Sequence, residues 1–417
     1  MKNIFAISRL GLLAAFLFAT AYPGTAQTNE FDPPALYLSW QRDPSTTMTI
    51  QWHTLDATGR SELQFKKLEG GSWSTAKGSS EPMPYSTRII HTVELTKLTA
   101  DTYYLFRFTG NAREYKFRTM PLDLKKPVRF ISGGDVYHQR DLMDQMNALA
   151  AKLDPAFVVL GGDLAYAVGG KNSDKDNVQR WYDYFDSWKQ LAVAPDGRLI
   201  PHLVTIGNHE VVGFWDKTPA DALGFYALFA MPGKQGYNHL DFGNYMTLLL
   251  LDSQHTRPVA GAQTKWLEQT LSKRKRVPHL FPVYHIPGYP SVRSFDGGEN
   301  GHISAAIREH WSPLFEKHGV KISFENHEHA FKRTHPIRNG KVDMEGVTYL
   351  GDGAWGVRLR ETHPADTTWY LAKAGAIRHM YLVTLYPDQR HIVAVDGDGK
   401  IFDEIYQRVE KSRALKP

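Results

Sequence analysis

The sequence Phe157-Val-Val-Leu-Gly-Gly-Asp-Leu-Ala-Tyr166 joins an unbroken apolar run to polar side chains. Its β-branched and aromatic residues predict a buried strand. Comparable runs span 128–131, 203–206, 280–283 and 321–324. Polar residues follow all five runs, namely Asp135, Asp163, Tyr166, Asn208, His285, His327 and His329. Because ligands bind at the carboxyl ends of strands in an open α/β sheet, the sequence predicts one site whose oxygen and imidazole ligands hold two metal ions.

Taken alone, each of the motifs that follow these strands is ambiguous. Asp163 could cap a helix, His209 could be a loop histidine without a partner, and His285 could be a satisfied core histidine. His327-Glu328-His329 is more specific, because residues two apart in an extended segment point to the same side and can reach two neighbouring ions. The presence of the whole set favours the metal site.

An all-β domain is expected before this one, over residues 31–121. Its apolar runs have a period of two and break about every ten residues, which is typical of a sandwich of about seven strands. The segment Leu98-Thr-Ala-Asp-Thr-Tyr-Tyr104 resembles the tyrosine corner of fibronectin type III domains. Over residues 126–410 strands alternate with helical faces at 142–153, 178–192 and 303–315, and strands return near the end. This pattern predicts an α/β domain.

Residues 1–26 indicate the cellular compartment. They carry Lys2 and Arg9, an apolar stretch and then Gly24-Thr25-Ala26, the pattern of a cleavable secretory signal peptide. We therefore expect a secreted or periplasmic protein, with a signal anchor as the alternative.

Composition narrows the class of protein. The chain has 0 Cys and therefore no disulfide, but 42% of its 417 residues are hydrophobic, enough for sizeable cores. Its basic residues, which give a net charge of +5, are interspersed with acids, and no later apolar run has the length of a membrane helix. We therefore expect no nucleic-acid partner and no membrane partner.

Five blocks of sequence carry a resemblance to a known family. They are Gly134-Asp135, Gly162 to Tyr166, Gly207-Asn-His-Glu210, Val283 to Pro287 and Asn326 to His329. In order and spacing they resemble the purple acid phosphatases, which belong to the calcineurin-like metallophosphoesterases. The tyrosine in the second block discriminates, because most other metallophosphoesterases lack it. The resemblance implies a fibronectin type III-like sandwich followed by a calcineurin-like α/β sandwich.

The resemblance also implies how the ligands divide between two metal ions. It assigns Asp135, Tyr166 and His329 to one ion, and Asp163 to a bridging position. It assigns Asn208, His285 and His327 to the other ion. Two carboxylates and a phenolate suit iron(III), whereas an amide oxygen and two imidazoles suit iron(II), zinc or manganese. Such a pair polarises a phosphate ester and activates water as a hydroxide nucleophile.

Further residues are expected near the substrate. By resemblance, His209 lies beside the leaving oxygen and donates a proton or a hydrogen bond, while Glu210 orients it, shares its task or is structural. The chain departs from the family pattern after Asp135, where Val136-Tyr137-His138 brings Tyr137 near the first metal. There Tyr137 covers the site or restricts substrate size.

The loop from Gly288 to Gly301 lacks the histidines that some family members present to phosphate. Its nearest candidates for substrate contact are Tyr289, Arg293 and Glu299, although Arg293 could instead pair with Glu299 at the rim. Trp355 either lines the pocket or packs in the core. Asn326 replaces a Gly of the family pattern, a change that fits because Asn also tolerates left-handed backbone conformations.

The sequence therefore predicts an exported dinuclear-metal phosphatase that hydrolyses small phosphate monoesters. A phosphodiesterase on the same centre is the first alternative, because the same two ions serve both reactions. A surface binding protein with a vestigial metal site is the second. The natural ester, the second metal and the oligomeric state stay open.

Overall fold

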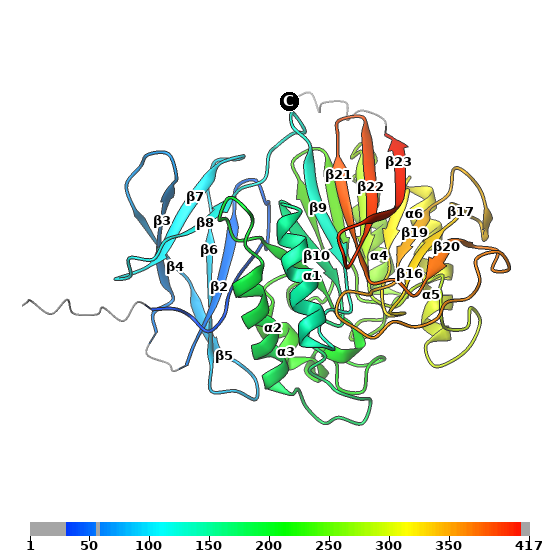
Figure 1. Cartoon of the computed structure of the whole chain (residues 1–417), viewed down its shortest axis with the longest axis horizontal. Coiled ribbons are helices and arrows are strands. Elements are labelled where there is room, and N and C mark those ends of the chain that lie inside the picture. The colour runs from blue at the N-terminus through cyan, green and yellow to red at the C-terminus, as the bar shows by residue number, and fades with distance from the viewer. Residues whose placement is uncertain (1–30, 56–58, 410–417) are drawn as a thin grey trace, which may run out of the picture.

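A computed structural model describes residues 31–55 and 59–409, which form an all-β domain followed by an α/β domain (Figure 1). This order confirms the predicted fold class. The signal peptide expected at 1–26 lies outside the described residues. Within the described ranges, no helix combines the length and apolar character needed to cross a membrane.

The N-terminal domain is a sandwich of two four-stranded antiparallel sheets, ordered β1-β2-β6-β5 and β4-β3-β7-β8. In β7, alternate residues Tyr104, Phe106 and Phe108 are buried in the core, which is the predicted period of two. The eight strands are β1 (Leu36–Ser39), β2 (Met48–Thr54), β3 (Glu62–Lys67), β4 (Ser74–Lys77), β5 (Ser79–Pro82), β6 (Ile89–Leu95), β7 (Tyr103–Phe108) and β8 (Tyr115–Arg118).

Two of these strands are not evident in the sequence. Strands β4 and β5 are almost wholly exposed, so their residues show no apolar alternation, and only pairing with β3 and β6 defines them. The predicted tyrosine corner is confirmed, because the Thr99 backbone N–H donates to the Tyr104 hydroxyl at 2.9 Å.

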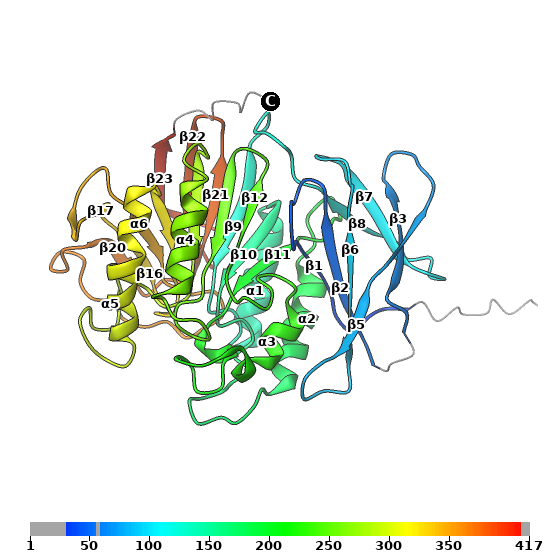
Figure 2. The same ribbon diagram turned by 180° about the vertical axis from the view of Figure 1, so that it is seen from behind.

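The second domain stacks a six-stranded sheet on a seven-stranded sheet. Helices α1 and α2 lie in front of the first sheet in Figure 1, and α4, α5 and α6 cover the second in Figure 2. The sheet orders are β11-β10-β9-β21-β22-β23 and β12-β13-β14-β15-β19-β16-β20, with β17 and β18 paired separately.

The strands of this domain are β9 (Val128–Gly133), β10 (Phe157–Gly161), β11 (His202–Thr205), β12 (Asn238–Phe242), β13 (Met246–Leu250), β14 (His279–Val283), β15 (Ile322–Phe324), β16 (Phe331–Thr334), β17 (Ile337–Arg338), β18 (Lys341–Val342), β19 (Thr348–Gly351), β20 (Leu371–Gly375), β21 (His379–Leu385), β22 (Gln389–Asp396) and β23 (Ile401–Arg408). The helices are α1 (Arg140–Lys152), α2 (Val178–Leu191), α3 (Leu223–Leu228), α4 (Ala262–Ser272), α5 (Gly301–His310) and α6 (Ser312–Lys317), with short 3₁₀ turns η1 (Asn208–Glu210) and η2 (Pro219–Asp221).

The unbroken apolar run of β10 is explained by burial on both faces. Phe157 and Val159 face the core between the two sheets, whereas Val158 and Leu160 face the core beneath α1 and α2. Because every residue of the strand is buried, polar residues do not alternate with apolar ones. Each such side chain contributes roughly 1.5–3 kcal/mol of burial free energy.

One predicted helix is divided in two. The apolar face expected over 303–315 is shared by α5 and α6, which meet at Trp311. Pro313 lies in the first turn of α6, where its missing N–H is tolerated, whereas a continuous helix would place the proline in the interior.

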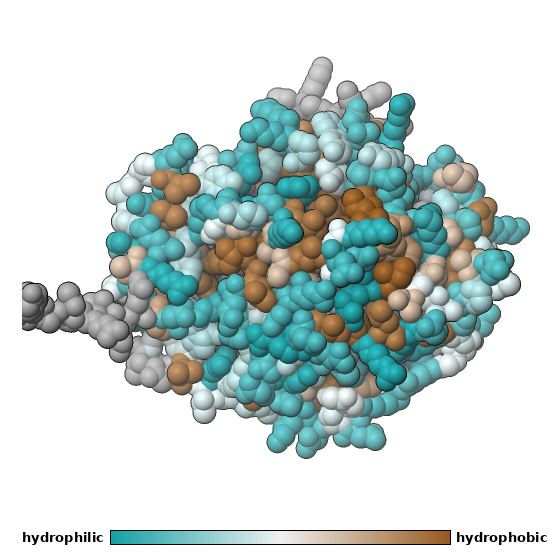
Figure 3. Space-filling view, in the orientation of Figure 1, coloured by the Kyte–Doolittle hydropathy of each residue, from teal (hydrophilic) through white to brown (hydrophobic). Residues whose placement is uncertain are grey.

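The sandwich packs directly against the α/β domain. Tyr37 of β1 stacks on Phe185 of α2 with ring centroids 4.3 Å apart, and its hydroxyl donates to the Leu228 carbonyl. Trp40 contacts Phe157 edge to face. Figure 3 shows that the outer surface of this view is largely hydrophilic, with hydrophobic residues gathered near its middle. The sandwich therefore supports α2 and β10, the strand that leads to Asp163.

Candidate metal centre

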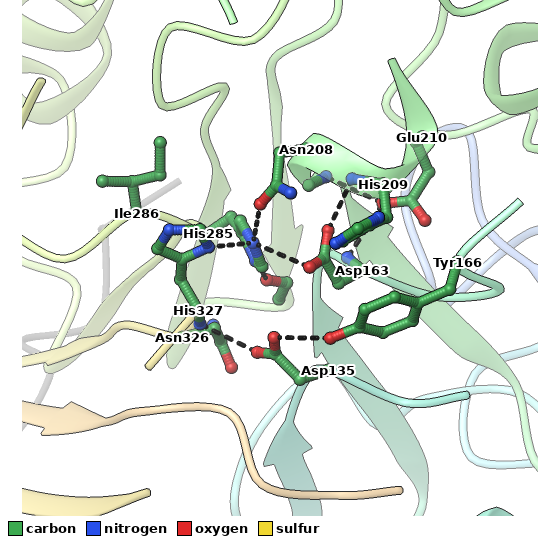
Figure 4. A network of polar contacts seen from close by, with 12 residues as sticks. Asp135, Asp163, Tyr166, Asn208, His209, Glu210, His285, Ile286, Asn326 and His327 are labelled. Carbon is green, nitrogen blue, oxygen red and sulfur yellow. Dashed lines mark hydrogen bonds and ion pairs between the residues drawn. The ribbon is translucent and has the colours of Figure 1, made fainter. Parts of the chain in front are cut away.

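The predicted ligands meet where parallel strands of both sheets end. Strands β9, β10 and β11 run parallel in one sheet, and β13, β14, β15 and β19 in the other. The loops after five of these strands bring together Asp135, Asp163, Tyr166, Asn208, His285, His327 and His329, most of which Figure 4 labels. The topology thus explains how residues nearly 200 positions apart share one site.

One group of ligand atoms surrounds His285. Its Nε2 lies 3.1 Å from Asn208 Oδ1, 3.0 Å from His327 Nδ1 and 3.4 Å from Asp163 Oδ2. These residues are buried. They are the residues that the family resemblance assigns to the second ion, together with the bridging Asp163.

A second group surrounds Asp135. Its Oδ1 lies 3.0 Å from His329 Nε2 and 3.1 Å from the Tyr166 hydroxyl, which is itself 2.9 Å from His329 Nε2. Asp163 belongs to both groups: its carboxylate lies within 4.8 Å of the ligand atoms of His285 and His327, and of those of Asp135 and His329. It therefore occupies the position expected of a bridging ligand.

The orientation of the histidines fits cation binding. His285 Nδ1 faces the Gly161 carbonyl at 2.8 Å and His329 Nδ1 faces the Arg358 carbonyl at 3.3 Å. A carbonyl only accepts, so each Nδ1 carries the proton and, in a neutral ring, Nε2 presents its lone pair to the site. Lone pairs of nitrogen and oxygen thus converge on one region, and a positive charge there offsets their mutual repulsion.

The shifted pKa values of His285, Asp163 and Tyr166 also favour a positive charge in the site. Burial lowers the pKa of His285, but the Asp163 charge outweighs this effect and raises it to about 9. Burial raises the pKa of Asp163, yet the neighbouring His285 and His209 bring it well below its usual range. Burial and the charges of Asp135 and Asp163 raise the pKa of Tyr166, so a phenolate here requires a strong cation beside it.

Backbone conformation positions the ligands. Asp135, Asp163, Tyr166, His327 and His329 all have positive φ, between 51° and 79°. His327 and His329 lie in the two ligand groups that share Asp163, but the extended segment expected for them is wrong, because both have positive φ. The positive φ predicted for Asn326 belongs instead to His327. The Asn326 side chain fills the space beside Gly134 and Gly161.

Two glycines make room for the carboxylates. A Cβ on Gly207 would lie 2.2 Å from the Asp163 backbone nitrogen, and one on Gly353 would lie 1.7 Å from Asp135 Oδ2. Neither distance is possible for real atoms, so both positions need glycine.

Glu210 links the loops that carry Asp163 and Asn208. It is completely buried, and its carboxylate accepts hydrogen bonds from the backbone N–H groups of Gly207, Asp163 and Leu164 at 2.8–2.9 Å. Burial and the Asp163 charge raise its pKa to about 8. Among the alternatives left open by the sequence, these contacts favour a positioning role, and a direct catalytic role stays a prediction.

His209 is fixed in a defined orientation. Its Nδ1 lies 2.6 Å from the Val168 carbonyl and therefore donates to it, and its ring stacks on Tyr166 with centroids 4.3 Å apart. Among the described residues no hydrogen bond of the other nitrogen, Nε2, is found, and His209 lines the adjacent cavity.

The cavity beside His209 has a volume of about 550 Å³, and its lining contradicts the expected substrate contact of Tyr137. The cavity is lined by Tyr166, His209, His329 and His138, whereas Tyr137 does not line it. Tyr137 is buried, and its hydroxyl donates to Asp183 of α2 at 2.8 Å. The predicted substrate contact at Tyr137 is therefore wrong, because its side chain turns toward α2.

The expected substrate contacts in the 288–301 loop are also corrected. Tyr289 is buried against Tyr349 and Tyr370, away from the cavity. Arg293 pairs with Glu328 at 2.6 Å, not with Glu299, and donates to the His327 carbonyl, so it braces a ligand loop.

Trp355 is likewise not part of the cavity wall. It is buried, and its indole N–H donates to Asn147 of α1. The alternative of a core position is therefore correct.

The sequence did not reveal the basic wall of the cavity. Arg180, Arg358 and Arg360 line it together with His138. Only the spacing of Arg358 and Arg360, two apart after a Gly-rich segment, gives a hint, and their loop has no periodic pattern.

Comparison with known sequences agrees with this geometry. Residues 33–119 match the family described as purple acid phosphatase, N-terminal domain, and residues 125–331 match the calcineurin-like phosphoesterase family. The chain belongs to the purple acid phosphatases. This family consists of metal-dependent phosphoester hydrolases, and membership implies a centre of two metal ions.

Three relatives define how far the similarity extends. Purple acid phosphatase 18 of Arabidopsis thaliana is 28% identical over 352 residues, which cover 80% of this chain and 74% of that protein. An uncharacterized protein of Mycobacterium tuberculosis is 26% identical over 384 residues, covering 80% of this chain but 66% of that protein, just under two thirds of its length. The structure of the purple acid phosphatase PPD1 from yellow lupin (Lupinus luteus) seeds has a TM-score of 0.72 at 18% identity, covering 90% of this chain and 75% of the other, and shares its fold.

The two ligand groups predict different effects of removing Asp163 and Asn208. Asp163→Ala should release both metal ions, because Asp163 alone belongs to both groups. Asn208→Ala should mainly release one. Metal analysis of purified variants measures this, with the exposed Asp366→Ala as a matched control that keeps wild-type content. Two tightly held ions in Asp163→Ala would contradict the bridging assignment.

Proposed function

We propose that this chain is an exported phosphatase that hydrolyses small phosphate monoesters at a dinuclear metal centre. The observation that carries the proposal is the pair of ligand groups sharing Asp163 beside a basic cavity. We assign iron(III) to Asp135, Asp163, Tyr166 and His329, and iron(II), zinc or manganese to Asp163, Asn208, His285 and His327. Three of the four donors in the first group are hard anions, whereas the second group has two imidazoles and an amide oxygen besides Asp163. Export rests on the predicted signal at residues 1–26.

When bound, the two ions supply Lewis acidity and a hydroxide nucleophile for in-line attack at phosphorus. The contribution of His209 follows from its hydrogen bond to Val168, which occupies Nδ1. Only Nε2 is then available to the substrate, and it can donate a proton only when the ring is an imidazolium. In that form, His209 presents its Nε2 proton from a ring that the Val168 hydrogen bond holds in place.

The basic cavity favours monoesters over the rival diesters. A monoester dianion carries one more negative charge than a diester, and both the proposed metal ions and the neighbouring cavity wall with Arg180, Arg358 and Arg360 favour the more negative ester. A surface binding protein with a vestigial site is disfavoured, because all seven predicted ligands are present and converge.

The two enzyme activities are distinguished by paired substrates. The value of kcat/KM for p-nitrophenyl phosphate should exceed that for bis(p-nitrophenyl) phosphate by roughly tenfold or more, since one charge near a cation contributes about 1–4 kcal/mol. Activity should require added metal and disappear in Asp163→Ala. Preference for the diester would favour the rival enzyme, and two bound ions without hydrolysis of either ester would favour a binding protein.

If Tyr166 binds iron(III), the iron-loaded protein should be coloured. Iron-loaded protein should absorb visible light through charge transfer from the phenolate to iron(III), and Tyr166→Phe should lose this band. Tyr137→Phe is the matched control, because Tyr137 lies outside both ligand groups and should keep the band. A colourless iron-loaded wild type would contradict ligation by Tyr166.

A proton donated by His209 should matter most for a basic leaving group. His209→Ala should slow hydrolysis of ethyl phosphate by about 10²–10⁴, the usual range for general acid catalysis, and that of p-nitrophenyl phosphate much less. His138→Ala, which alters the same cavity, should show no such dependence. Metal content should be unchanged. Equal losses on both esters would assign His209 to substrate positioning.

A further inference from the structure

Three arginines from two separate segments line the cavity beside the metal ligands. Arg180 belongs to α2, whereas Arg358 and Arg360 belong to the loop between β19 and β20. His138, Tyr166, His209 and His329 complete the titratable part of the wall, which contains no carboxylate. The cavity is thus strongly cationic on one side.

No carboxylate among the described residues pairs directly with these arginines, although the charge of Asp183 acts on Arg180. Asp183 accepts a hydrogen bond from Tyr137, and Glu328 pairs with Arg293. In the part of the chain that the structure describes, none of the three arginines forms an ion pair within 4.0 Å. Unpaired guanidinium groups at a shared cavity are suited to an anionic ligand.

Arg180 is held in place by backbone groups. Its guanidinium donates to the carbonyls of Ala165 and Tyr137 and lies over the Tyr137 ring, 3.9 Å from its centroid. The position of its charge is therefore defined before any ligand binds, which reduces the entropy lost on binding.

Arg358 and Arg360 are tied to a metal ligand. The Arg358 carbonyl faces His329 Nδ1, and the Arg360 N–H donates to the His329 carbonyl at 3.1 Å. Arg360 Nη1 also lies 3.4 Å from the His327 carbonyl. Arg358 is exposed at the cavity, and no hydrogen bond of its side chain is found within the described ranges. Both charges therefore stand at the rim of the metal centre.

The balance of charge indicates what these arginines bind. Ions of +3 and +2 with Asp135, Asp163 and Tyr166 as anionic ligands leave about two positive charges, which a phosphate dianion balances. Counting the hydroxide nucleophile as well leaves about one net negative charge, so three arginines exceed what a single phosphate requires. In addition, the cavity of about 550 Å³ has the size of a small-molecule pocket, larger than one phosphate group requires.

We propose that Arg180, Arg358 and Arg360 form a second anion subsite, so that the preferred substrates are phosphate esters carrying a further phosphate or carboxylate group. This inference rests on the proposed function, because the first phosphate must occupy the metal centre. Arg358 and Arg360 determine specificity, and Arg180 supplies a fixed charge on the opposite segment.

Matched substrates test the subsite on the metal-loaded full chain. Ethylene glycol monophosphate has one anionic group, phosphoglycolate adds a carboxylate, and ethylene glycol bisphosphate adds a second phosphate. Wild type should show higher kcat/KM for one or both doubly anionic esters, by roughly tenfold, the factor expected for one hydrogen bond to a charged group. The two esters distinguish a carboxylate from a phosphate as the second group.

Arg358→Gln and Arg360→Gln should each reduce this preference by several-fold, with a smaller loss on the monophosphate. Arg276→Gln removes the same charge from an exposed position outside the cavity and should leave all three rates unchanged. Absence of a preference in wild type, or a preference that survives both cavity variants, would overturn the subsite.

A binding measurement separates this inference from the proposed function. Calorimetry should give tighter binding of pyrophosphate than of orthophosphate to wild type, with the difference reduced in Arg358→Gln. If that difference is found but no ester is hydrolysed, the subsite stands and the proposed phosphatase activity fails. If esters are hydrolysed but neither pyrophosphate nor the doubly anionic esters are preferred, the phosphatase stands and the subsite fails.

Discussion

The site depends on keeping one carboxylate, that of Asp163, charged and almost without contact with water. A buried charge is costly unless it is paired and hydrogen-bonded. The His209 N–H donates to Asp163 Oδ1 at 2.8 Å, and His285 lies beside Oδ2. The remaining lone pairs of both ligand groups point to the same region. A positive charge at that point is therefore required to offset the repulsion among the buried carboxylates and lone pairs.

Holding the ligands in place has a conformational cost that the rest of the fold offsets. Five ligands have left-handed backbone conformations, each worth about 1–3 kcal/mol of strain for a residue other than glycine. Buried Lys332 contributes to the constraint, because it pairs with Glu325 and Asp352 at 2.6 Å and 2.8 Å. The Asp352 carbonyl in turn accepts from the Glu328 and His329 N–H groups. A buried ion group thus fixes the backbone that carries His329.

The strands and their ligands were predictable because burial leaves a clear pattern. An unbroken apolar run such as 157–160 identifies a strand buried on both faces, and the polar residue after it lies at the sheet edge. Exposed β4 and the directions of side chains in loops leave no such pattern. Tyr137 and Trp355 lie close in sequence to cavity residues, yet their hydrogen bonds to Asp183 and Asn147 turn them into the core. Only tertiary partners decide such orientations.

Within the site, the proposed metal ligands and the arginines of the cavity also differ in how the fold positions them. All the proposed metal ligands follow strand ends, so the two sheets fix their mutual positions. Arg358 and Arg360 come instead from the loop between Gly351 and Leu371, which contains neither helix nor strand. A change in that loop can alter the charge of the cavity wall without moving a strand, provided that the backbone contacts to His329 remain. Those contacts are the point at which substrate recognition and metal binding constrain each other.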